Sequence, residues 1–120
     1  IISRAARGPL DFCARYGGEE FALVLFAPSG AEPTATGEQI RQGTLDLRIP
    51  HSHSSVAGFV SVSVGSAIAT PGSKRSLAGL IQAADEALYL AKQSGRNRVL
   101  HVDADTSATR TGSFRVASAR

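Results

Sequence analysis

The sequence predicts a mixed α/β domain, and three segments lead to this prediction. Residues 11–26 have the pattern of two strands joined at a glycine pair, residues 59–70 alternate valine with small side chains, and residues 77–93 carry apolar side chains at helical spacing. Of the 120 residues, 42% are hydrophobic and 19% are charged, which is typical of globular domains. The chain therefore has enough apolar residues to bury one modest core.

The first of these segments is predicted to be a β-hairpin. Residues 11–16 and the almost entirely apolar residues 21–26 are its strands. Gly17 and Gly18 lie between them, and glycine adopts the positive φ angles of a two-residue turn without steric cost. We therefore expect the glycine pair to form the turn, with two glutamates directly after it.

A helix and a strand are predicted in the middle of the chain. Residues 35–47 favour a helix in which Ile40, Leu45 and Leu47 are the larger apolar side chains. A loop follows, and the period-2 alternation of residues 59–70 (FVSVSVGSAIAT) is typical of a strand with one covered face.

The most clearly marked helix is predicted at residues 77–93. Its apolar residues recur at three- and four-residue spacing, Ser76 precedes it as an N-cap, and Gly95 stands just past its end. Residues 98–102 are predicted to form a short final strand.

The last segment, residues 104–120, is rich in Ser, Thr, Ala and Arg and predicts a disordered basic tail. We therefore divide the chain into a folded part, residues 1–103, and this tail. The formal net charge of +3 comes partly from the tail. Its arginines are scattered and lack aromatic partners, so we expect no nucleic-acid partner.

Two adjacent carboxylates at a hairpin tip, Glu19 and Glu20, are well placed to hold a hard divalent ion. Magnesium accepts such ligands when phosphate oxygens complete its coordination shell. Gly17 and Gly18 have no side chains, so a nucleotide could approach the backbone beside them. The alternative for so short a motif is a hairpin turn followed by solvated acids.

A second group of residues suited to an anion lies at the end of the predicted helix. Lys92 is in its last turn and Arg96 is just beyond it, so both could bind one phosphate group. The alternative is that both are solvated and complement the dipole at the C-terminal end of the helix.

The order and spacing of three motifs resemble the GGDEF domain of diguanylate cyclases. They are RYGGEEF, with GGEEF as an accepted form of the signature, then SVSVGSAIA and ADEALYLAKQSGRNRV. The resemblance covers roughly residues 11–102. It implies a fold related to the palm of nucleotidyl cyclases and polymerases, with a mostly antiparallel sheet flanked by helices and the signature on a hairpin.

The resemblance implies a diguanylate cyclase, which condenses two GTP molecules into cyclic di-GMP and releases two pyrophosphates. Each domain would hold one GTP, and two domains would meet face to face in a homodimer. Glu19 and Glu20 would be the catalytic acids and the ligands of Mg²⁺ or Mn²⁺. The other matching positions would bind the substrate: Gly17, Gly18, Lys92 and Arg96.

The chain departs from the family pattern at its start. In the family, a metal-binding Asp and the residues that read guanine lie several tens of residues before the glycine turn, whereas only sixteen residues precede Gly17 here. We therefore expect a C-terminal portion of a GGDEF domain that lacks its N-terminal half and is inactive alone. We expect the longer parent protein to be an active cyclase. The alternative is a non-catalytic regulatory module that binds GTP or a partner domain.

Many family members also bind their product at an inhibitory site built on R-x-x-D, just before the signature. Asp11 occupies the Asp position, but Gly8 occupies the Arg position and Arg7 lies one residue earlier. Arg41, in the middle helix, could supply a second arginine. The candidate product-inhibitory residues are therefore Asp11, Arg7 and Arg41.

Cysteine content and hydropathy bear on the expected location. Cys13 is the only cysteine, so no disulfide can form within the chain. No apolar run approaches the ~18 to 20 residues that a membrane helix needs. We expect a cytoplasmic segment without membrane contact, whether or not the parent protein is anchored upstream.

Overall fold

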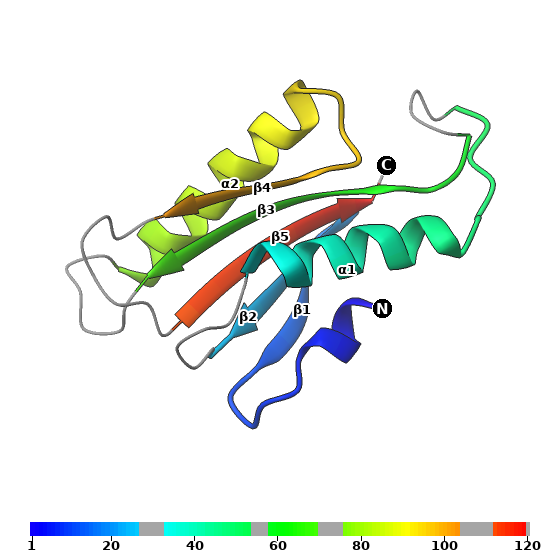
Figure 1. Ribbon diagram of the computed structural model, residues 1–120. Coiled ribbons are helices and arrows are strands. Elements are labelled where there is room, and N and C mark those ends of the chain that lie inside the picture. Colours follow the sequence, from blue (N-terminus) through cyan, green and yellow to red (C-terminus); the bar gives the residue numbers. More distant parts are fainter. Residues whose placement is uncertain (27–32, 54–57, 70–75, 104–111, 120) are drawn as a thin grey trace.

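The described residues form one sheet with a helix on each side, in a computed structural model that describes residues 1–26, 33–53, 58–69, 76–103 and 112–119. Figure 1 shows one helix crossing in front of the sheet and the other behind it. In chain order the elements are the 3-10 helix η1 (Ile2–Ala5), β1 (Phe12–Gly17), β2 (Glu20–Leu25), α1 (Pro33–Asp46), β3 (Val62–Ala69), α2 (Leu77–Gln93), β4 (Val99–Asp103) and β5 (Gly112–Ala119).

The five strands are arranged in the order β1-β2-β5-β3-β4. Neighbouring strands are antiparallel except β3 and β4, which are parallel and are connected through α2. A parallel pair needs a crossover connection, which a helix commonly provides. A mostly antiparallel sheet flanked by helices confirms the predicted fold class.

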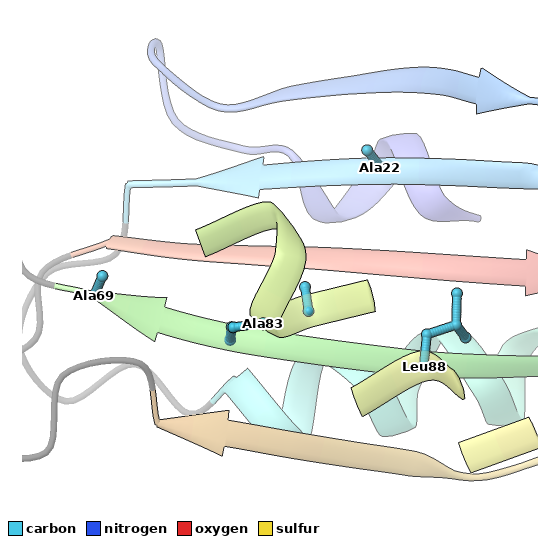
Figure 2. Close-up of a cluster of buried hydrophobic side chains, with 6 residues drawn as sticks. Ala22, Ala69, Ala83 and Leu88 are labelled. Atoms are coloured by element: carbon cyan, nitrogen blue, oxygen red, sulfur yellow. The ribbon is translucent and has the colours of Figure 1, made fainter. Parts of the chain in front are cut away.

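The two faces of the sheet are covered by different kinds of side chain. Alternate residues of β2 point to opposite faces, as the pleat of a strand requires. The buried cluster under α2 is almost entirely alanine (Figure 2): Ala22, Ala67, Ala69, Ala83, Ala84 and Leu88. The cluster under α1 has larger side chains: Leu23, Leu25, Ile40, Val62 and Val64.

Strand β3 is buried on both faces, whereas its alternation predicted one covered face. All eight of its residues are buried. Val62 and Val64 pack in the cluster with Ile40 of α1. On the other face the backbone of α2 lies against Gly65. The alternation of valine with small residues in β3 therefore reflects how much space each helix leaves for side chains, and not exposure to solvent.

Helix α2 has the bounds that the sequence predicted, because both of its ends are marked locally. Ser76 Oγ accepts a hydrogen bond from the backbone N–H of Gly79 at 3.0 Å. At the other end Gly95 has a φ of +122°, and the N–H of Arg96 donates to the carbonyl of Ala91 at 3.0 Å. Of the two hydrogen bonds that define a Schellman C-cap, this is the one that spans more residues.

We expect Ser76→Ala to lower the free energy of unfolding by about 1 kcal/mol, because the N–H of Gly79 loses its acceptor. Urea denaturation followed by circular dichroism would measure this change. Ser76→Asp is the matched control, since its carboxylate also accepts at this position. If Ser76→Ala and Ser76→Asp lower the free energy of unfolding equally, the side-chain acceptor at this position does not stabilise the helix.

Apart from β5, the remaining helices and strands agree with the predictions within a few residues, and η1 was not predicted. Within the described ranges, no helix combines the length and the apolar character needed to cross a bilayer.

The largest difference from the predictions lies in the C-terminal segment. Residues 112–119, expected to be disordered, form β5 between β2 and β3, while residues 104–111 and 120 lie outside the described residues. In register, Phe21 and Val64 flank Ala117 of β5 on the two sides. Without β5, both flanking strands would present unpaired backbone groups in the middle of the sheet. The expectation of disorder does not hold for residues 112–119, because pairing across the sheet outweighs the composition.

Candidate functional site

The turn of the β1–β2 hairpin is formed by Gly18 and Glu19, one residue later than predicted. Gly17 is the last residue of β1 and pairs with Glu20, so only two residues lie between the strands. The register shifts between Arg15 and Gly17, which leaves Tyr16 as the extra residue of a β-bulge. Among the described glycines, Gly58 and Gly95 have positive φ. The glycine pair is therefore not needed here for a left-handed backbone.

The hairpin tip is held by a side chain and is open on its outer surface. Arg15 donates from Nε and Nη2 to the carbonyl oxygen of Gly18, at 3.0 and 2.6 Å. A Cβ built on Gly17 or Gly18 would meet no described atom within 4 Å. The space beside both glycines is thus free for a flat group to approach the backbone, as predicted for a nucleotide.

The hairpin acid Glu20 lies beside Lys92 of α2. Lys92 Nζ is 3.7 Å from Glu20 Oε1, and the two side chains are 16% and 39% exposed. Glu20 begins β2 and Lys92 is in the last turn of α2, so the sheet and the helix bring them together. The structure therefore joins members of the two groups of residues that the sequence singled out separately.

A third charged residue, Asp85, belongs to this cluster, although the sequence analysis did not select it as a site residue. Burial raises the pKa of Asp85, and the negative charge of Glu20 raises it further, while the positive charge of Lys92 lowers it. Asp85 and Lys92 are seven residues apart on α2, about two helical turns, and so lie on the same face. That spacing was the signal in the sequence that could have identified it.

Arg96 follows α2 in a left-handed stretch of backbone. Gly95, Arg96 and Asn97 have successive φ angles of 122°, 64° and 46°. The Nη1 atom of Arg96 is buried and has no hydrogen-bond partner among the described residues. A guanidinium nitrogen with an unused donor is suited to a ligand oxygen, and the phosphate contact of Arg96 stays a prediction.

The candidate product-inhibitory residues have other partners. Asp11 accepts hydrogen bonds from the backbone N–H groups of Phe26 and Gly8 at 2.8 Å and of Arg7 at 3.2 Å. Partial burial raises the pKa of Asp11, but these bonds outweigh burial, so the pKa is lowered. Arg7 lines a cavity of about 330 Å³ between η1 and α1. Among the described residues, no hydrogen bond or ion pair joins Arg41 to Arg7 or Asp11.

The family model "Diguanylate cyclase, GGDEF domain" matches residues 1–98. The chain belongs to the GGDEF domain family. This confirms the resemblance inferred from the three sequence motifs.

Three relatives of this GGDEF chain are much longer than the segment that it matches. It is 41% identical over 91 residues to diguanylate cyclase DosC of Escherichia coli K12, covering 74% of the chain and 19% of the relative. It is 37% identical over 99 residues to diguanylate cyclase A of Treponema denticola, covering 82% and 26%. It is 38% identical over 91 residues to the uncharacterized protein YtrP of Bacillus subtilis, covering 75% and 14%. The chain therefore spans about a quarter or less of these three relatives.

Glu19 and Glu20 are the residues of this GGDEF domain that the sequence predicted as metal ligands. In the described part of the chain, no group of three or more His, Cys, Asp or Glu residues could hold a metal ion. Magnesium commonly takes only one or two protein carboxylates, with phosphate oxygens and water as its other ligands. Glu19 and Glu20 fit that incomplete set, and they do not form an all-protein cage.

Proposed function

We propose that this chain is the C-terminal part of a diguanylate cyclase domain that condenses two GTP molecules into cyclic di-GMP. The observation that carries the proposal is the contact between Lys92 Nζ and Glu20 Oε1 at 3.7 Å. This contact brings a cation suited to phosphate beside an acid at the hairpin tip, a combination that supports transfer of a nucleotidyl group. The relatives named as diguanylate cyclases support the same activity.

In this proposal, the residues at the end of α2 bind the leaving phosphates. Lys92 acts as a point charge, and Arg96 donates its unused Nη1 N–H to a terminal phosphate oxygen. Gly17 and Gly18 leave room for the nucleotide along the hairpin. Together these contacts hold one GTP with its α-phosphate toward the acids and its pyrophosphate over the helix end.

The acids act on the attacking group. The 3′-hydroxyl of one GTP attacks the α-phosphorus of the other, pyrophosphate leaves, and the hydroxyl proton passes to a carboxylate of Glu19 or Glu20. Magnesium or manganese supplies, when bound, positive charge that polarises the phosphate and makes the hydroxyl more acidic.

Two copies of the domain take part in this scheme, because each binds one GTP and presents it to the other. We propose that the 120-residue chain is inactive alone, since it spans only about a quarter or less of the diguanylate cyclases that it matches.

The test is production of cyclic di-GMP from GTP and Mg²⁺ by the protein from the complete reading frame. We expect Glu20→Gln to lower the rate by about 10²- to 10⁴-fold, since it removes a proton acceptor beside the reacting hydroxyl. Lys92→Ala should weaken GTP binding by about 10- to 100-fold, because a charge-assisted contact is lost.

Glu86→Gln is the matched control, because Glu86 is an exposed acid on α2, the helix that also carries Lys92. Its rate should stay at the wild-type value. If the wild-type protein binds GTP but makes no cyclic di-GMP, the chain is a regulatory module, and the catalytic proposal fails.

A further inference from the structure

The loop that carries Arg96 has an unfavourable backbone conformation. Gly95 tolerates its positive φ, but Arg96 and Asn97 also have positive φ angles, of 64° and 46°. A residue other than glycine is strained at such angles, and asparagine is strained least. Such a conformation persists only where surrounding contacts fix it.

Three hydrogen bonds fix this loop. The N–H of Arg96 donates to the carbonyl of Ala91 at 3.0 Å, and Arg98 Nε donates to the carbonyl of Arg96 at 3.0 Å. Both partners lie within a few residues of the loop. The third bond comes from a distant element, since Arg41 Nη1 of α1 donates to Asn97 Oδ1 at 3.1 Å.

Arg41 is itself held in place on α1. Its Nε and Nη2 atoms contact Glu38 Oε2 at 3.0 and 2.9 Å, and Nη2 also donates to Gln42 Oε1 at 3.2 Å. The side chain is 18% exposed. Because α1 and α2 cover opposite faces of the sheet, its bond to Asn97 connects the two helical layers at the start of β4.

We propose that Arg41 is a positioning residue that holds Asn97 and thereby sets the Arg96 guanidinium for a pyrophosphate or triphosphate group. This inference rests on the proposed function for its ligand. The inference assigns Arg41 a role at the proposed substrate site, beside Arg96.

The first experiment measures the loop without any nucleotide. Amide hydrogen exchange, read by nuclear magnetic resonance on the 120-residue chain, reports the bond from Arg96 N–H to Ala91. We expect exchange at Arg96 to be about tenfold faster in Arg41→Ala than in wild type, since one charge-assisted hydrogen bond is lost. Gln39→Ala is the matched control, because Gln39 is an exposed residue of the same helix with no hydrogen bond to Arg41 among the described residues, and its loss should leave this rate unchanged. Equal rates at Arg96 in wild type and Arg41→Ala would overturn the proposal.

The second experiment measures binding of pyrophosphate with Mg²⁺ by calorimetry. Asn97→Gly keeps the backbone conformation but removes the acceptor, and should weaken binding about tenfold, whereas Asn97→Asp keeps an acceptor and should bind as wild type does. Arg41→Ala should likewise weaken binding about tenfold, but not when combined with Arg96→Ala. An undiminished effect of Arg41→Ala in the Arg96→Ala background would contradict a role through Arg96. If wild type binds no pyrophosphate, the proposed phosphate site fails, and the exchange rates alone decide whether Arg41 holds the loop.

Discussion

Gly65→Ala should destabilise the chain by about 3 kcal/mol or more, enough to unfold much of a marginally stable domain. A Cβ built on Gly65 would overlap the backbone nitrogen of Leu88 and the carbonyl oxygen of Ala84, and would lie 2.6 Å from the Cα of Leu88. These are backbone atoms of α2, which cannot move aside without displacing the helix. Urea denaturation would show the loss as a lower midpoint with an unchanged slope.

Two other glycines provide controls for this substitution. A Cβ on Gly43 of α1 would meet only the side chain of Ile1, no closer than 3.5 Å. Gly43→Ala should therefore stabilise the chain by about 0.5 to 1 kcal/mol, through the higher helix propensity of alanine. Gly37→Ala should fall between the two, since its Cβ would press on a methyl group of Val99 at 2.7 Å. If the Gly65→Ala and Gly43→Ala variants are equally stable, α2 does not pack against β3 as closely as described.

Deleting residues 112–120 should abolish cooperative unfolding of the remaining chain. Strand β5 pairs with β2 on one side and with β3 on the other, so its loss splits the sheet and exposes two backbone edges. Open edges of this kind favour association between chains. Thermal melting followed by circular dichroism, together with size-exclusion chromatography, would detect the lost transition and the larger species.

A point substitution tests the same strand without shortening the chain. Ala117 lies in register between Phe21 and Val64, in the middle of the sheet. Ala117→Pro removes a backbone N–H from this central strand and should destabilise the sheet by about 3 kcal/mol, while Ala117→Ser keeps the N–H and should change little. Identical melting of the proline and serine variants would show that residues 112–119 do not pair in solution.

Features with local causes could be predicted from the sequence. The bounds of α2 follow from Ser76 and Gly95, whose effects act within one helical turn. The hairpin was predicted as well, but its turn was placed one residue early. The register shift beside Tyr16 adds a residue to β1, and the pattern of apolar residues carries no signal for such a bulge.

Features that depend on distant partners could not be predicted. Residues 112–119 form a strand because they pair with β2 on one side and with β3 on the other. Strand formation depends more on such context than on composition. The contact between Glu20 and Lys92 likewise needs the whole sheet to bring the hairpin under α2. Asp85 was not selected as a site residue, because Glu20, whose charge acts on it, lies far away in the sequence.

The alanine surface of α2 limits how the site at its end can be regulated. Ala84, Ala87 and Ala91 are fully buried, and Gly65 admits the helix backbone itself, so rotating or sliding α2 would create immediate overlaps. Lys92 therefore lies on a helix, α2, whose position on the sheet is fixed by close packing. Under the proposed function, we expect a regulatory signal to change how two whole domains meet, because the close packing of α2 on β3 leaves the helix no room to shift.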